Sequence, residues 1–175
     1  MSEISIRPAG PSDLAAITRI YADAVRGGTA SFEIDPPDQN EMARRFAALC
    51  GSGFPYLVAE GAGSVAGYAY AGPYRGRPAY RWTVEDSIYV AAGLQRRGIG
   101  RALLDRLIRE AETRGFRQMI AVIGDSKQAS SIALHAGAGF RMIGTFEAVG
   151  FKFDRWLDSV LMQRALGNGA ATDPR

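Results

Sequence analysis

The chain has 175 residues, of which 47% are hydrophobic and 22% are charged, a balance that fits one globular domain and excludes a disordered protein. Its net charge of +3 is too small to indicate nucleic-acid binding, and no apolar run approaches the roughly 20 residues of a membrane helix. One cysteine and one histidine cannot form an internal disulfide or a conventional zinc site, and no secretory signal is visible. We therefore expect a cytoplasmic protein without a metal, a nucleic-acid partner or a membrane partner.

Apolar periodicity and breaks at glycine and proline divide the first half of the chain into elements. They predict, in order, a strand at 3–7, a helix capped by Ser12 or Asp13 and ended by Gly27, a loop at 29–38, a helix at 38–50 and a β-hairpin at 55–72 around the turn "GAGS".

The second half alternates between strands and helices. The prediction is a loop at 72–78, a strand at 79–91, a helix at 103–115 closed by Gly115, a strand at 119–124, a helix at 129–137 and strands at 139–151 and 156–166. This order, β-α-α-β-β-β-α-β-α-β-β, predicts one mixed α/β sheet with helices on both faces. We expect a single domain at 1–166 and a disordered tail at 167–175.

The joint between the strand at 79–91 and the following helix holds an unusual group of residues. Three arginines, Arg96, Arg97 and Arg101, surround Gly98 and Gly100 where the helix begins. The first N–H groups of a helix lack intrahelical partners and favour an anion, and glycines let the anion approach. The joint is therefore either a phosphate cradle or a tight turn with a solvated basic rim. It matches neither a P-loop nor a dinucleotide-binding fingerprint.

The context of this joint favours the cradle. The pattern Gln95-x-x-Gly98-x-Gly100, after a long strand and before a strong helix, resembles the acetyl-CoA pyrophosphate loop of the GNAT acetyltransferase superfamily. The segments "AGPYRGRPAYRWTVEDSIYV", "GFRQMIAVIGDS", "LHAGAGF" and "VGFKFDRWLDSVLMQ" resemble the phosphinothricin and methionine sulfoximine acetyltransferases over about residues 3–165. The resemblance implies the GNAT fold, a mostly antiparallel twisted sheet flanked by helices, and transfer of an acetyl group to the amine of a small amino acid.

The resemblance implies a binding site for acetyl-CoA along one strand and the glycine loop. The amide of Val90 is expected to face the thioester carbonyl. The expected cofactor contacts are Ile88, Tyr89, Val90, Gln95, Arg96, Arg97, Gly98, Ile99, Gly100, Arg101 and Gln128. At residue 128 many relatives have Asn, and the longer Gln side chain is a departure. Gly137, in the expected helix at 129–137, is a second departure, without a functional explanation from sequence.

Glu85 is the expected general base. A carboxylate in mid-strand is costly to bury unless it is paired or functional, and an ammonium group must lose a proton before it can attack a thioester. Burial would have to raise the pKa of Glu85 from its ordinary range for it to act as a base. The alternative is a structural partner for an arginine such as Arg81.

His135 is the second expected catalytic residue. It is the only histidine and lies four positions before Gly139 in "LHAGAGF". Many GNAT enzymes have a tyrosine here that protonates the departing thiolate. The resemblance implies that His135 is a proton donor or a relay for the amine, and a structural histidine is the alternative.

The acceptor is expected between a basic loop, the centre of the long strand and one residue of the early loop. These residues are Phe32, Arg75, Gly76, Arg77, Tyr80, Glu85, Asp86 and Ser87. An arginine fork matches a carboxylate or phosphinate, although an exposed basic loop is the ordinary alternative. Lys152 and Trp156 fit strand packing or a dimer contact as well as they fit the substrate. The resemblance implies a homodimer.

Three functions remain open from the sequence. The first is acetylation of an amino acid or analogue such as phosphinothricin, methionine sulfoximine or methionine sulfone. The second is acetylation of another amine, for example a protein N-terminus, a polyamine or an aminoglycoside, although the basic loop disfavours cationic acceptors. The third is a CoA-binding module without catalysis, which an intact Glu85 disfavours.

Overall fold

The computed structural model describes residues 4–174, and within this range the strands form one seven-stranded sheet. The strands are β1 (Ser5–Pro8), β2 (Tyr56–Gly61), β3 (Ser64–Pro73), β4 (Thr83–Val90), β5 (Gln118–Gly124), β6 (Arg141–Lys152) and β7 (Arg155–Ala165), in the spatial order β1-β2-β3-β4-β5-β7-β6. Only β4 and β5 pair in parallel, and all other neighbours are antiparallel. The predicted order of elements and the mostly antiparallel sheet are confirmed.

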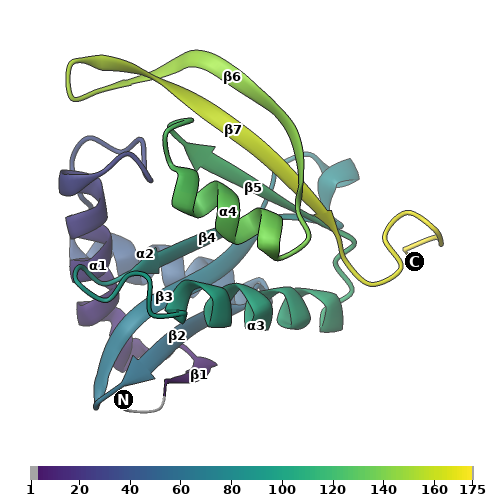
Figure 1. Cartoon of the computed structure of the whole chain (residues 1–175). Coiled ribbons are helices and arrows are strands. Elements are labelled where there is room, and N and C mark those ends of the chain that lie inside the picture. The colour runs from purple at the N-terminus through teal and green to yellow at the C-terminus, as the bar shows by residue number, and fades with distance from the viewer. Residues whose placement is uncertain (1–3, 175) are drawn as a thin grey trace.

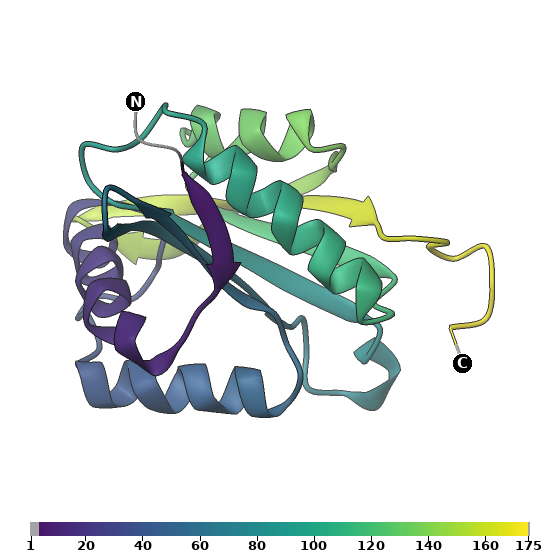
Figure 2. The ribbon, with the colours of Figure 1, turned by 90° about the horizontal axis from the view of Figure 1, so that it is seen from below.

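Helices cover both faces of this sheet. They are α1 (Leu14–Gly27), α2 (Gln39–Gly51), α3 (Ile99–Thr113) and α4 (Ala129–Gly137). Figure 2 shows α3 and α4 on one side of the sheet and α1 and α2 on the other. Within the described residues no helix is long and apolar enough to cross a membrane.

Each face has its own hydrophobic core. The face under α3 is aliphatic, with Leu103, Leu104 and Leu107 fully buried. The face under α1 and α2 is aromatic and holds a group of tyrosines: Tyr21, Tyr56, Tyr68, Tyr70 and Tyr89. The two faces of the central strand β4 therefore meet different chemical surroundings.

Two predicted boundaries differ from the structure for local reasons, and one predicted cap makes other contacts than expected. The strand predicted at 79–91 begins only at Thr83, because Pro78–Tyr80 form a 3-10 helix in which Pro78 occupies the first position. The helix predicted from 103 begins at Ile99, so the glycine loop runs straight into it. Asp13 does stand at the start of α1, but its carboxylate binds Arg7 and the Gly10 amide rather than the helix.

The tail predicted at 167–175 follows β7, and its residues 167–174 are among those described. After β7 the chain to residue 174 forms turns that lie beside Arg117. The Arg117 guanidinium donates to the carbonyls of Gly169 and Asp173, and Leu166 is fully buried. Arg117, the buried side chain of Leu166 and a hydrogen bond from the Gly167 amide to Glu112 together hold this short segment. Residue 175 and the first part of the strand predicted at 3–7 lie outside the described residues.

The hairpin of β6 and β7 extends beyond the body of the sheet (Figure 1). Lys152, at its tip, is only 5% exposed, and its ammonium donates to the carbonyls of Val25, Gly28 and Ser31 at 2.7–2.9 Å. The last carbonyls of a helix lack intrahelical donors, so this lysine closes the C-terminal end of α1 from a distant hairpin. Burial lowers its pKa, and Glu33 opposes that shift.

Candidate active site

The site begins where two parallel strands part. β4 and β5 pair only from Thr83 with Gln118 to Asp86 with Ala121. Beyond this point β4 continues beside β3 to Val90, while β5 continues beside β7 to Gly124. The carboxyl ends of the two strands therefore diverge and leave an opening within the sheet.

Backbone groups of β4 face this opening without a strand partner. The amide of Ala91 donates to the carbonyl of Ala66 on β3 at 2.9 Å. Hydrogen-bonding directions alternate along an antiparallel strand, so the amides of Tyr89 and Ser87 also face β3. The amides of Ile88 and Val90 consequently point the other way, toward the opening. Such groups can bind an extended ligand as an added strand or stabilise an oxyanion.

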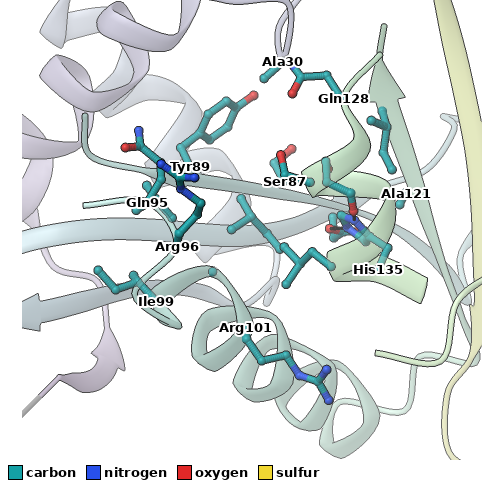
Figure 3. A pocket seen from close by; sticks show the side chains of 18 of the residues that line it. Ala30, Ser87, Tyr89, Gln95, Arg96, Ile99, Arg101, Ala121, Gln128 and His135 are labelled. Atoms are coloured by element: carbon teal, nitrogen blue, oxygen red, sulfur yellow. Dashed lines mark hydrogen bonds and ion pairs between the residues drawn. The ribbon is translucent and has the colours of Figure 1, made fainter. Parts of the chain in front are cut away.

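A cavity of about 530 Å³ occupies the opening and continues to the start of α3 (Figure 3). It has walls from β4, β5, the glycine loop and the first turns of α3 and α4. The residues that line it are Ala30, Asp86, Ser87, Ile88, Tyr89, Val90, Leu94, Gln95, Arg96, Gly98, Ile99, Gly100, Arg101, Ala121, Val122, Ile123, Gly124, Gln128, Ser130, Ser131, Leu134 and His135.

The glycine loop has the geometry of an anion site. Gly93, Arg96 and Gly98 have positive φ angles of 78°, 60° and 81°, and such turns direct successive N–H groups into one concavity. The first helical hydrogen bond runs from Ala102 to Gly98, so the amides before it remain available at the N-terminus of α3. Of the two alternatives left open by the sequence, the geometry favours the phosphate cradle.

The two glycines of the loop serve different purposes. Gly98 needs its positive φ, which strains other residues, whereas no protein atom lies near where its Cβ would be. Gly100 has an ordinary helical backbone, but a Cβ there would face Leu134 at 3.5 Å and Val90 at 3.8 Å, both in the cavity wall. Its missing side chain therefore keeps the cavity open beside the helix N-terminus.

The arginines of the loop are not equivalent. Arg96 lines the cavity, while Arg97 does not and is exposed. Arg101 lines the cavity but turns along α3 toward Asp105, which accepts from its Nε at 2.8 Å (Figure 3). A Cβ on Gly137 would lie 3.2 Å from the guanidinium of Arg101, so this glycine gives Arg101 room to pass α4.

Glu85 and Asp86 are neighbours on β4 that point to opposite faces. Glu85 lies on the tyrosine side with Ser87, and no described residue pairs with its carboxylate. Burial raises its pKa to about 7, and the charge of Asp86 adds to this rise. A carboxylate with this pKa is half ionised near neutral pH, as a general base requires. The alternative of an ion pair with Arg81 is wrong, because that side chain instead contacts Trp82 and the Pro78 carbonyl.

Asp86 lies on the other face and meets His135 of α4. Both residues are buried, and Oδ2 of Asp86 lies 2.9 Å from Nε2 of His135. Nδ1 of His135 lies 2.8 Å from the carbonyl oxygen of Ser131. Burial by itself lowers the pKa of His135, but Asp86 and this carbonyl outweigh it and raise the pKa above its ordinary value.

The loop between α1 and α2 closes the cavity at Ala30. Phe32 in this loop packs where glycines leave room: a Cβ on Gly124 or Gly150 would lie 2.8 Å or 2.5 Å from its ring. Gln128 donates to Thr29 at 3.1 Å and so ties the loop to the start of α4. Figure 3 shows Gln128 beside Ala30, the next residue of this loop. Together with Lys152, these contacts hold the loop against β5 and the hairpin.

The basic loop after β3 does not reach the cavity. Arg75 and Arg77 are exposed, as is Gly76. Arg75 lies over the rings of Tyr74 and Tyr80, with its guanidinium carbon 5.1 and 5.8 Å from their centroids. This loop leads directly into the N-terminal end of β4, close to Glu85 in the chain, whereas the glycine loop follows the C-terminal end of β4.

Residues 6–161 match the family described as an acetyltransferase (GNAT) domain. The chain belongs to the GNAT acetyltransferase family. It is 52% identical over 170 residues to a phosphinothricin N-acetyltransferase of Alcaligenes faecalis, covering 97% of this chain and 86% of that protein. It is 42% identical over 170 residues to an L-methionine sulfoximine/L-methionine sulfone acetyltransferase of Salmonella typhimurium, covering 97% and 99%.

A solved structure supports the same assignment. A GNAT phosphinothricin acetyltransferase from Sinorhizobium meliloti, in complex with AcCoA, superposes with a TM-score of 0.96 at 49% identity over 100% of this chain and 94% of that one. The predicted family and the GNAT fold are confirmed, and the chain is an N-acetyltransferase.

The structure gathers most of the residues predicted for the GNAT cofactor. All of them line the cavity except Arg97, and Asp86, Ser87 and His135 join them. Phe32, Arg75, Gly76, Arg77, Tyr80 and Glu85 lie outside the cavity lining. Among the described residues, no group of three or more His, Cys, Asp or Glu side chains could hold a metal ion.

Sequence reasoning missed one wall of the site. Ala30, Leu94, Ser130, Ser131, Leu134 and the end of β5 line the cavity but carried no chemical signature. The signal that could have found β5 is topological, because adjacent parallel strands end at the same edge of a sheet and ligands bind beyond their carboxyl ends.

Proposed function

We propose that this GNAT enzyme transfers the acetyl group of acetyl-CoA to the α-amine of a small amino acid or analogue of the phosphinothricin, methionine sulfoximine or methionine sulfone type. The observation that carries the proposal is the unpaired carboxylate of Glu85, whose pKa is raised. The next residue of β4, Asp86, lines a cavity that the free amides of β4 and the N-terminus of α3 face. The names of the relatives support the acceptor class.

Acetyl-CoA is the proposed cosubstrate. The amides at the start of α3, with Gln95, Arg96 and Arg101, supply donors for the pyrophosphate. Arg97 is exposed and is proposed to meet an outer phosphate. The free amides of Ile88 and Val90 supply donors for the pantetheine arm and the thioester carbonyl, as expected from the sequence.

Glu85 is the proposed general base. It removes a proton from the acceptor ammonium, so that a neutral amine attacks the thioester. Glu85 and the glycine loop lie near opposite ends of β4. The phosphates of acetyl-CoA and the amine of the acceptor can therefore occupy different ends of the opening. Ser87, next on the same face, is proposed to orient the amine.

The acceptor's acid groups are proposed to bind at the basic loop. The guanidinium of Arg75 packs over the rings of Tyr74 and Tyr80, so its paired N–H donors are already positioned in the absence of a ligand. Arg77, Gly76 and Phe32 complete the proposed acceptor side.

The test is a thiol-release assay with acetyl-CoA. We expect fast release with phosphinothricin, methionine sulfoximine or methionine sulfone, and slow release with spermidine, an aminoglycoside or a peptide N-terminus. Thiol release with the cationic amines alone would contradict the proposed acceptor and would indicate an acetyltransferase for polyamines, aminoglycosides or protein N-termini. Acetyl-CoA binding without release to any amine would support a module without catalysis.

We also propose that the enzyme is a cytoplasmic homodimer formed through the β6–β7 hairpin. This hairpin exposes seven large apolar side chains, each at least 45% accessible: Met142, Ile143, Phe146, Val149, Phe151, Phe153 and Trp156. An apolar surface of this extent is uncommon on a monomer. An exposed free thiol at Cys50 suits a reducing compartment.

Light scattering during size-exclusion chromatography tests the dimer. The expected mass is twice 18.8 kDa, and Trp156→Arg is expected to give the monomer. Ile34→Arg, at an equally exposed residue outside the hairpin, is the matched control. A wild-type mass of one chain at micromolar concentration would rule out the proposed dimer.

A further inference from the structure

Asp86 and His135 are the buried charged residues of the cavity wall. They are 7% and 5% exposed, come from β4 and α4, and are joined by the 2.9 Å contact between Oδ2 and Nε2. The second oxygen of Asp86, Oδ1, is buried and has no hydrogen-bond partner among residues 4–174. The charge of this carboxylate is therefore compensated by His135 and by no other described side chain.

The hydrogen bonds of the imidazole determine where its protons are. A carbonyl oxygen can only accept, so Nδ1 of His135 must carry the hydrogen that it shares with Ser131. In a neutral ring Nε2 would then turn a lone pair toward the Asp86 carboxylate, which is repulsive. The pair must hold one further proton between Nε2 and Oδ2, and a buried imidazolium–carboxylate pair satisfies both contacts.

The other groups around the ring do not supply a competing acceptor. Phe140 meets the imidazole edge-on, with centroids 5.0 Å apart. Arg101 of α3 approaches α4 at Gly137, and Arg164 of β7 donates to the carbonyl of Ala138, so both cations lie at the same C-terminal end of α4 as His135. A guanidinium has no acceptor, so neither arginine can accept a hydrogen bond from the ring. Glu85 points to the opposite face of β4. Asp86 is thus the acidic partner that the ring meets.

We propose that Asp86 is a positioning residue that holds His135 as a cation in the wall of the cofactor cavity, and that this cation stabilises the thiolate leaving group of the transfer reaction. The inference rests on the proposed function. The N–C bond forms as the C–S bond breaks, and the electron pair goes to sulfur. Glu85 passes the first proton of the ammonium to solvent and then accepts the second, which the nitrogen loses as the amide forms. The CoA thiolate then leaves beside the cation. Both imidazole nitrogens are already engaged, so a free neutral ring that donates from an unoccupied N–H is excluded by the geometry.

The single histidine of the chain makes a direct test possible. In tag-free protein, nitrogen NMR of the ring reports its protonation without assignment of other histidines. We expect both nitrogens protonated at pH 7 and a titration midpoint above the ordinary value of about 6.5. Asp86→Asn is expected to lower the midpoint by at least about one pH unit, a tenfold change in proton affinity. Asp23→Asn, the same change on the exposed face of α1, is the control.

Activity supplies the second reading. We expect kcat of the wild type to fall at high pH, with the same midpoint that NMR gives for His135. In Asp86→Asn this fall should move to lower pH by as much as the NMR midpoint moves, while KM for the acceptor is unchanged. A structural role would reduce kcat without moving the midpoint of this fall. His135→Gln is expected to remove the fall.

The outcomes separate this inference from the proposed function. A single protonated nitrogen in the wild type at pH 7, or an unchanged midpoint in Asp86→Asn, overturns the inference even in an active enzyme. The wild-type spectrum decides the matter if Asp86→Asn does not fold. A cationic ring in a protein that acetylates no amine would support the pair and contradict the proposed function.

Discussion

The two faces of β4 carry neighbouring carboxylates with different properties. On the tyrosine face Glu85 has no cationic partner in the part of the chain that the structure describes, and burial raises its pKa to about 7. On the α4 face Asp86 is more deeply buried but has an imidazole 2.9 Å away. The difference teaches that burial alone does not determine what a carboxylate can do. An unpaired one gains affinity for a proton, while a paired one stabilises the positive charge of its partner.

The same division separates the two halves of the proposed reaction. In the proposed reaction the amine loses its proton to Glu85 on one face of β4, and the negative charge of the leaving thiolate is stabilised by the Asp86–His135 pair on the other. Ser87 of the Glu85 face and Asp86 of the other face both line the cavity, although Glu85 itself does not. Substitutions on each face should therefore have separable effects.

The largest effect is expected from Glu85→Gln. Loss of a general base should reduce kcat/KM for the acceptor by at least about 100-fold, because the amine must then lose its proton unaided. Binding of acetyl-CoA, measured by calorimetry, should change by less than about threefold. Glu60→Gln, at a surface ion pair with Arg7, is the control and should retain full activity. Equal activity in Glu85→Gln would reject the base assignment.

A smaller effect is expected at the cofactor end. Gly100→Val places a side chain between Val90 and Leu134 and should weaken acetyl-CoA binding by about 10- to 100-fold, in line with the loss of one or two good contacts. Calorimetric titration measures the change. Gly51→Val, where no atom lies near the new Cβ, should bind acetyl-CoA like the wild type. Unchanged binding in Gly100→Val would place the ligand elsewhere.

About a tenfold effect is expected in the basic loop. Arg75→Ala removes one proposed fork for the acceptor's acid group and should raise KM for the acceptor about tenfold with little change in kcat. Steady-state kinetics at saturating acetyl-CoA measure both constants, and Arg109→Ala on α3 is the matched exposed control. A fall in kcat alone would contradict a role in binding.

The smallest effect concerns stability. The pKa of Glu85 is about 7 in the folded state and about 4.5 unfolded, so its contribution to stability is full below 4.5 and is lost as pH rises through 7. Glu85→Gln avoids this loss. It should be more stable than the wild type by about 1–2 kcal/mol at pH 8 but not at pH 4. Urea unfolding at the two pH values measures this, and an equal difference at both would contradict the raised pKa.

The fold and the cofactor half were predictable because their signals are local. Hydrophobic periodicity predicted the order of elements. Gly98 and Gly100 are visible in the sequence as residues of the loop itself, because one needs a positive φ and the other leaves space for a ligand. The pair of Asp86 with His135 spans 49 positions, and Lys152 reaches carbonyls more than 120 positions away. Such contacts depend on how strands and helices pack in three dimensions, which no local pattern encodes. The basic loop at residues 75–77 is exposed, so it makes few packing contacts from which a role could be predicted.

The most direct test of the central claim is the pH dependence of kcat/KM for phosphinothricin in the wild type and in Glu85→Gln. We expect kcat/KM of the wild type to rise with a midpoint near pH 7, at the pKa of Glu85. The variant should show no such rise, because its rate should follow only the ionisation of the amine. The same midpoint near 7 in both proteins would show that another group removes the proton.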